Sequence, residues 1–157
     1  MVANMKLLDY LSENDVLSRL HASTREGIIE EMVAHLKESG KIDDSEELVN
    51  ILLDREMLGS TGIGHGVAIP HGRLSGLNEI LLVFGRSPEG VDFDAHDGGT
   101  VNLFFLLVAP EDSAGLHLKT LARISRLVKN PECRKSLLES DDRGTLYQTI
   151  EEEDQRH

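Results

Sequence analysis

The chain has 157 residues, of which 39% are hydrophobic and 28% charged, a composition that fits one soluble globular domain with a core of its own. Its 28 acidic and 16 basic residues give a net charge of −12, the wrong sign for a protein that binds a nucleic-acid backbone or an anionic membrane. Aromatic residues make up only 4%, so platforms for base stacking are not expected. The acidic surface either keeps the chain soluble or steers it onto a basic protein partner.

Cys133 is the only cysteine, which excludes a disulfide within the chain. The longest apolar run, residues 103–109, has the length of a strand and not of a membrane-spanning helix. The start of the chain carries no secretory signal. These features predict a cytoplasmic protein that does not insert into membranes.

The start of the chain predicts only short elements, a turn at residues 7–11 and a short or edge strand at 16–20. A first helix is then expected from Ser23 or Thr24, with Glu26 as the capping-box partner of Ser23. Apolar residues at helical spacing continue this helix for about four turns.

Gly40 is expected to end the first helix, because a glycine commonly follows the last turn. A second helix is predicted to begin near Asp44 or Ser45, to end at Gly59, and to carry Arg55 in its last turn. Arg55 is therefore expected close to whatever the following glycine-rich segment builds.

Three strands are predicted next, at residues 67–69, 80–84 and 101–108. Turn signals separate the last two, at residues 88–90 and 97–99.

Three helices should follow. The first begins near residues 113–116 and stops at Asn130-Pro131, and the others lie at about 131–139 and 143–152. The polar tail from Glu151 is expected to fray. Together the elements predict an α/β fold, a single-domain sandwich over residues 1–157 with a mixed, parallel and antiparallel, central sheet and helices on both faces.

The glycines at positions 59, 62, 64 and 66 permit close backbone approach and positive φ angles. A nucleotide P-loop would need Lys followed by Ser or Thr after its last glycine, and none is present. A dinucleotide fingerprint fails because Val67 stands where its last glycine would be. The segment therefore predicts either a tight helix-to-strand connection or a non-nucleotide site.

His71 follows Pro70, which fixes φ and suits the end or edge of a strand. His71 is thus expected to point outward from the end of a rigid element. Neutral imidazole is a good nucleophile, although such a histidine is also found simply as the polar end of a strand.

His117 precedes Leu121, Ile124 and Val128 by four, seven and eleven residues, which places it on the buried side of a helix in its first turn. The N-terminus of a helix favours an anion. His117 is therefore either a hydrogen-bonded core residue or part of an anion site.

Arg55 has the geometry to clamp a phosphate group, or it complements the dipole of its helix. Ser60 and Thr61 offer hydroxyls that either bind phosphate oxygens, orient an imidazole, or bond to their own loop. His65, His71 and His117 match no recognised zinc spacing, so no metal site is expected. The other histidines are read as surface residues: His21, His35, His96 and His157.

At these residues the chain resembles the enzyme IIA domains of the bacterial phosphoenolpyruvate-dependent sugar phosphotransferase system, fructose–mannitol class. The resemblance spans about residues 23–150, whereas 1–22 and 151–157 carry no signature. It is most like the nitrogen-regulatory branch. The matching segments are Arg55-Glu56, Ser60 to Gly64, Gly66 to Gly72, Val91 to Ala95, Val101 to Pro110, and His117 with Leu121-Ala122.

The resemblance implies that His71 is the phosphorylated residue and that Arg55 and His117 lie beside it, while His65 receives no role. It implies phosphoryl transfer from a histidine phosphocarrier protein without nucleotide, metal or other cofactor.

Two functions stay open: a regulator that acts on target proteins through its phosphorylation state, or a carrier that passes the group to a IIB domain for fructose or mannitol uptake. No fused IIB domain or transmembrane segment is seen in the sequence, which favours the regulator. A metal-dependent hydrolase built on His65, His71 and His117 is a remote alternative.

Overall fold

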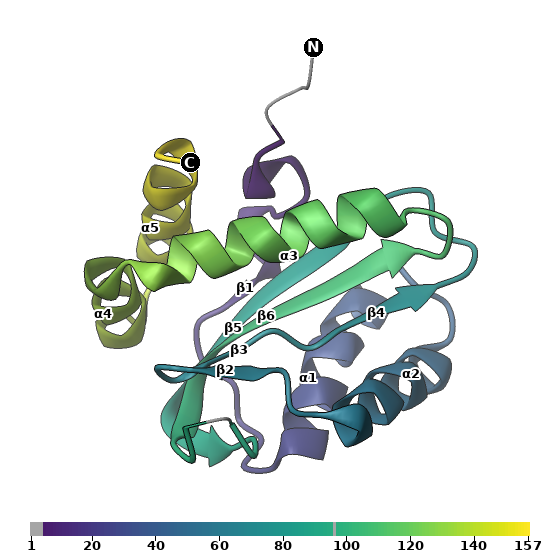
Figure 1. Cartoon of the computed structure of the whole chain (residues 1–157), viewed down its shortest axis with the longest axis horizontal. Helices are drawn as coiled ribbons and strands as arrows, with labels where there is room; N and C mark the ends of the chain where they lie inside the picture. The colour runs from purple at the N-terminus through teal and green to yellow at the C-terminus, as the bar shows by residue number, and fades with distance from the viewer. Residues whose placement is uncertain (1–4, 96) are drawn as a thin grey trace.

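A six-stranded mixed β-sheet lies at the centre of the molecule (Figure 1). The computed structural model describes residues 5–95 and 97–157. The strands are ordered β1-β5-β6-β3-β2, and β4 also pairs with β6. The elements are η1 (Leu7–Asp9), η2 (Glu13–Asp15), β1 (Val16–Leu17), α1 (Arg25–Glu38), α2 (Ser45–Leu58), β2 (Gly62–Gly64), β3 (Val67–Ala68), β4 (His71–Leu74), β5 (Leu81–Asp92), β6 (Thr100–Pro110), α3 (Ala114–Lys129), α4 (Pro131–Glu139) and α5 (Arg143–Gln155).

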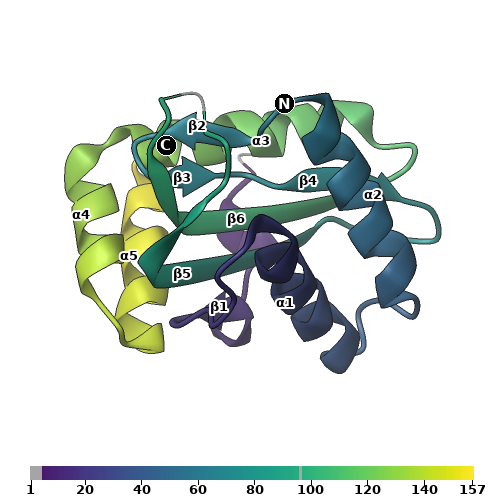
Figure 2. The same ribbon diagram turned by 90° about the horizontal axis from the view of Figure 1, so that it is seen from below.

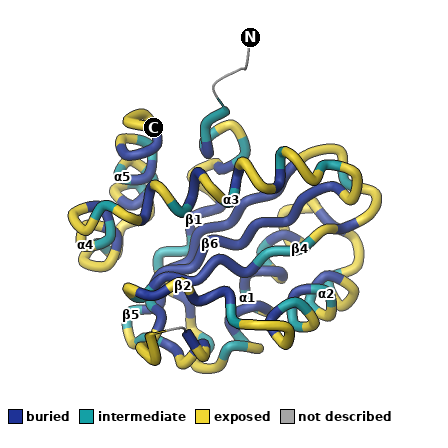
Figure 3. Tube along the Cα trace, in the orientation of Figure 1, coloured by how far each residue is buried: buried dark blue, intermediate teal, exposed yellow. Residues whose placement is uncertain are grey.

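Helices cover both faces of this sheet, α1 and α2 on one and α3 with α4 and α5 on the other (Figures 1 and 2). A hydrophobic core lies on each face of the sheet, and successive side chains of β5 point alternately into the two cores. Leu81 and Val83 face the α1–α2 side, whereas Leu82 and Phe84 face α3. The strands are therefore buried along most of their length (Figure 3). The predicted fold class is confirmed. No helix in the described ranges has the length and apolarity needed to cross a membrane.

The helices begin close to where the sequence places them, and Thr24 is the one of the two predicted N-caps that begins α1. Thr24 is the N-cap, and its Oγ1 accepts a hydrogen bond from the N–H of Gly27 at 3.0 Å. The capping box predicted for Ser23 and Glu26 is therefore wrong, because the helix begins one residue later than that pair requires.

The turn predicted at residues 88–90 is wrong as well. β5 continues through it to Asp92, and the pairing with β6 shifts register between Arg86 and Val91 before resuming opposite Val101. The extra residues of β5 form a bulge-like irregularity within one long strand. The turn-forming sequence therefore distorts the strand without ending it.

β3 and β4 together follow one straight course along β6. Val67 pairs with Leu103 and His71 with Leu107, so the parallel register is the same on both sides of Pro70. Pro70 has no N–H to donate, which interrupts the ladder, although its carbonyl still accepts from the N–H of Leu107 at 3.0 Å. His71 therefore opens a strand and is half-buried, where the sequence had placed it at the outer end of one.

The C-terminal tail does not fray as predicted. α5 runs to Gln155, and Asp154 is 2% exposed. The Nε of Arg123 on α3 donates to Oδ1 of Asp154 at 2.7 Å, and its Nη2 donates to the carbonyl of the same residue at 2.6 Å. Asp154, in the polar tail, is thus an inward-facing partner of α3, which composition alone does not reveal.

Replacing Asp154 by Ala leaves the guanidinium of Arg123 buried without its counter-charge. We expect Asp154→Ala to lower the free energy of unfolding by about 3–5 kcal/mol, the usual cost of removing one partner of a buried ion pair. Urea denaturation measures this. Asp141→Ala, at an exposed position just before α5, is the matched control and should change stability by less than about 0.5 kcal/mol. Equal stability of the two variants would contradict the assignment of Asp154 and Arg123 as a buried ion pair.

Candidate functional site

The site forms where the end of α2 meets the start of β4. Gly72 makes this contact close, because a Cβ added there would lie 3.0 Å from Cγ2 of Ile51 and 3.4 Å from Cδ2 of Leu52 on α2. The last turn of α2 carries Arg55 and Glu56. The absence of a side chain at position 72 therefore lets α2 bring these charged residues near His71.

A chain of hydrogen bonds joins α2 to His71. The carboxylate of Glu56, only 3% exposed, accepts from the hydroxyl of Thr61 and from its N–H, the latter at 3.1 Å. The carbonyl of Thr61 accepts from the N–H of Ile69 at 3.0 Å. The carbonyl of Ile69 accepts from Nδ1 of His71 at 2.7 Å. A buried charge on the helix thus fixes the loop, the strand and finally the imidazole.

The last of these bonds determines the tautomer of His71. A carbonyl oxygen can only accept, so Nδ1 carries the ring proton in the neutral form. The lone pair of the neutral ring then resides on Nε2. Nε2 is therefore the nucleophilic atom of this side chain.

His117 lies next to His71, as the resemblance to enzyme IIA domains implies. The two ring centroids are 5.5 Å apart, and the planes meet at 73°. His117 is 7% exposed, and its Nε2 is buried without a hydrogen-bond partner among the residues that the structure describes. Such an orphaned buried atom is uncommon and calls for a ligand group.

Both imidazoles are neutral near pH 7. Burial lowers the pKa of His71 below its ordinary value, the bond to Ile69 raises it, the charge of Arg55 lowers it and that of Glu56 raises it. Burial also lowers the pKa of His117, helped by His71 and Arg73. Neutral rings retain the lone pair that a nucleophile requires.

Arg55 is half-buried, and its Nη1 donates to the carbonyl of Gly59 at 2.8 Å. This bond holds the side chain over the beginning of the glycine-rich loop. Its Nε and Nη2 make no hydrogen bond within the part of the chain that the structure describes, so they remain able to hold an anion beside His71.

The hydroxyls of Ser60 and Thr61 are used inside the protein. Ser60 donates to the carbonyl of Phe93 at 2.7 Å and accepts from the N–H of Gly62 at 2.9 Å. Thr61 donates to Glu56. Of the roles considered from the sequence, support of the loop is the one that this geometry favours.

His65 is not part of this group. It occupies the β2–β3 turn at φ +58° and lines a pocket with Lys129 and Arg134. Within residues 5–95 and 97–157, no three His, Cys, Asp or Glu side chains are placed to hold a metal ion. His96, read as a surface residue, lies outside the described residues.

Two residues gained no role from the sequence, Glu56 and Arg73. Glu56 follows Leu48 and Leu52 at intervals of four, so a charged residue continues the buried stripe of α2. A charged residue in line with a buried apolar stripe is a sequence signal for a buried functional group. Arg73 follows His71 by two on β4 and hence shares its face of the strand.

Comparison with known proteins agrees with this geometry. The family model described as "Phosphoenolpyruvate-dependent sugar phosphotransferase system, EIIA 2" matches residues 9–153. The chain belongs to this family. The match begins well before residue 23, where the sequence signature starts, so the enzyme IIA domain includes most of the N-terminal segment.

Relatives of this enzyme IIA domain fall into two groups. It is 37% identical over 147 residues to a nitrogen regulatory protein of Bradyrhizobium diazoefficiens, covering 93% of this chain and 95% of that one. It is 35% identical over 150 residues to the fructose-specific EIIABC component of Bacillus subtilis, covering 96% of this chain but only 24% of that protein. Among solved structures, nitrogen regulatory protein IIA-Ntr of Neisseria meningitidis gives a TM-score of 0.84 at 31% identity, covering 90% of this chain and 97% of that one.

The two charges beside His71 act on its pKa in opposite directions. We expect Arg55→Gln to raise the pKa of His71 and Glu56→Gln to lower it, because the first removes a positive neighbour and the second a negative one. An NMR titration of the His71 ring C2–H measures both shifts. Arg19→Gln, which removes an exposed arginine paired with Glu89, is the control and should leave the titration unchanged. Shifts of the same sign in both variants would contradict this arrangement.

Proposed function

We propose that this enzyme IIA domain accepts a phosphoryl group on Nε2 of His71 from a histidine phosphocarrier protein, and that its phosphorylation state regulates partner proteins. The observation that carries the proposal is the 2.7 Å bond from Nδ1 of His71 to the carbonyl of Ile69. It presents Nε2 as the free nucleophile beside the orphaned Nε2 of His117.

The transfer balances without further reagents. Nε2 of His71 attacks phosphorus as the P–N bond to the donor's imidazole breaks, and the electron pair of that bond returns to the donor ring. His71 keeps the proton on Nδ1, so its ring becomes cationic. The carbonyl of Ile69 and the carboxylate of Glu56 stabilise that positive charge, because both already favour the protonated form of His71.

Arg55 and His117 hold the oxygens of the transferred group. Arg55 supplies its free guanidinium N–H groups, and His117 supplies an N–H from Nε2. Charge-assisted hydrogen bonds of this kind contribute about 1.5–3 kcal/mol each. In-line transfer between two imidazoles needs mainly such positioning and charge neutralisation. Ser60 and Thr61 support the loop that carries the site.

Exposed apolar side chains border these residues in the sequence. Met57 and Leu58, 81% and 86% exposed, follow Glu56, and Leu118, 66% exposed, follows His117. Such residues are typical anchors of a transient protein interface. The net charge of −12 favours a basic donor surface. Both features support docking of a phosphocarrier over His71.

The regulatory role is favoured because the nitrogen regulatory relatives match along nearly their whole length. The alternative, forwarding of phosphate to a IIB domain for sugar uptake, draws on the fructose-specific relative. One solved structure of this fold is a complex of enzyme IIA mannitol with phosphorylated enzyme IIB mannitol of Escherichia coli, at 21% identity and a TM-score of 0.76. At that identity the likeness concerns the fold alone.

His71→Ala is expected to abolish labelling by the phosphorylated phosphocarrier, because among the described residues only His71 combines a free Nε2 with the flanking Arg55 and His117. His117→Ala should slow labelling by roughly 10–100-fold without preventing it, since it removes one donor to the phosphoryl oxygens. Rapid-quench labelling measures both rates, and 15N NMR of the labelled protein should place phosphorus on Nε2. Labelling of His71→Ala at the wild-type rate, or phosphorus on Nδ1, would falsify the assignment.

Transfer to a purified sugar-specific IIB domain separates the two roles. The regulator should pass phosphate to it at least about 100-fold more slowly than a fructose enzyme IIA does under the same conditions. Partner capture should differ between the phosphorylated and unphosphorylated protein, with His71→Ala behaving as the unphosphorylated form. Fast transfer to the IIB domain, together with partner capture that is the same for the phosphorylated and unphosphorylated protein, would favour the role in sugar uptake.

A further inference from the structure

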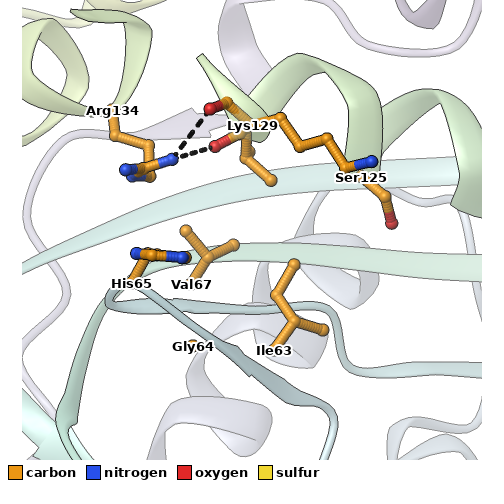
Figure 4. A pocket seen from close by; sticks show the side chains of 8 residues that line it. Ile63, Gly64, His65, Val67, Ser125, Lys129 and Arg134 are labelled. Carbon is orange, nitrogen blue, oxygen red and sulfur yellow. Dashed lines mark hydrogen bonds between the residues drawn. The ribbon is translucent and has the colours of Figure 1, made fainter. Parts of the chain in front are cut away.

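The pocket lined by His65 lies at the opposite end of α3 from His117, between the β2–β3 turn and the last turn of the helix (Figure 4). Twelve residues separate His117 from Lys129, or about 18 Å along a helix. The pocket has a volume of about 470 Å³, within the usual range for small-molecule sites. Its lining residues are Ile63, Gly64, His65, Val67, Ser125, Val128, Lys129 and Arg134.

The lining is basic in a strongly acidic protein. His65, Lys129 and Arg134 line the pocket, and no carboxylate does. An adjoining pocket shares His65 and Arg134, adds Lys135, and again lacks Asp and Glu. Three other pockets of this protein each have two or more carboxylates: Glu30, Glu38 and Glu46; Glu132, Glu152 and Glu153; and Glu26, Asp92 and Asp94. The basic groups are therefore concentrated here against the overall charge.

Lys129 and Arg134 are also free of acidic partners among the residues that the structure describes. No ion pair within the described ranges involves Lys129 or Arg134, and Lys129 is exposed. Nη1 of Arg134 donates to the carbonyls of Val128 and Lys129 at 2.7 and 3.1 Å, which fixes its guanidinium at the end of α3 (Figure 4). Asp97 accepts from the backbone N–H of His65 but does not line the pocket.

Apolar groups complete the pocket. Ile63 and Val67 come from the hairpin, opposite Lys129 and Arg134 in Figure 4, and Val128 comes from α3. Ile63 is 43% exposed although it sits in a strand. A ligand that suits this combination has an apolar body next to an anionic group.

The backbone at His65 is held in a conformation that non-glycine residues rarely adopt. Its φ is +58°, with Gly64 and Gly66 also at positive φ. The turn thereby places an imidazole facing the end of α3, where glycine would form the same turn without strain.

We propose that this pocket binds a small organic anion, a phosphate or carboxylate attached to an apolar group, at a site separate from the phosphorylation site. Lys129 and Arg134 bind the anionic group, and Ile63, Val67 and Val128 contact the apolar part. His65 closes the pocket from the hairpin. The site needs no phosphorylation of His71 and so does not depend on the role assigned to that residue.

Two-dimensional 1H–15N NMR titration tests the proposal on the unphosphorylated full chain. The probes are phenyl phosphate, phenylacetate and benzyl alcohol, which share a ring and differ in charge. At least one anion should shift the amides of Gly64, Ser125 and Lys129 with saturation, and benzyl alcohol should bind at least about tenfold more weakly. The stronger of the two anions identifies the preferred head group. Shifts confined to residues around His71, equal binding of benzyl alcohol, or no saturable shift at the pocket would overturn the proposal.

Matched variants locate the contact. Lys129→Gln should weaken binding roughly tenfold, the usual effect of losing one charge-assisted bond. His65→Asn should also weaken it, and Asn tolerates the positive φ of this position. Lys119→Gln, an exposed lysine near the other end of α3, is the control and should bind as the wild type does. Unchanged affinity in both Lys129→Gln and His65→Asn, with folded spectra, would also overturn the proposal.

Discussion

The buried carboxylate of Glu56 organises the surroundings of His71, the residue proposed above to be phosphorylated. It is a buried acceptor in the last turn of α2, and Thr61 donates to it twice. From Thr61 the connection passes through the backbone of Ile69 to the ring of His71. The last turn of α2, the glycine-rich loop and the ring of His71 are therefore linked through one anion. A buried charge is expensive unless its bonds are complete, which explains why so many elements converge on it.

Pro70 lies between the two strands that carry this arrangement. β3 and β4 keep a common register with β6, so the proline interrupts the ladder without displacing the strand. The N–H of Ile69 bonds to Thr61, and its carbonyl is left for the side chain two residues later. His71 thus combines the precision of a strand position with a half-exposed ring.

Much of this could be predicted from the sequence, because helical periodicity and the long apolar strands are local signals. They gave α2, α3 and β6, and they placed His117 on the buried side of α3. The hairpin of β2 was missed because Gly62 and Gly64 carry no apolar pattern, and β4 because His71 and Gly72 do not resemble a strand. Asp154 was read as part of a frayed tail because its partner, Arg123, lies 31 residues away. Sequence shows which side chains are charged, but only the fold shows which charges meet.

The exposed apolar residues at the end of α2 and in the first turn of α3 have a consequence for the protein's behaviour in concentrated solution. Met57, Leu58 and Leu118 would make identical copies adhere to one another. The net charge of −12 opposes this by mutual repulsion, which salt screens beyond about 8 Å at physiological ionic strength. Repulsion also vanishes near the isoelectric point of about 4.9. Solubility of the folded molecule therefore depends on its acidity more than on its core, and the surface charge that would attract the proposed basic donor also keeps copies of the chain apart.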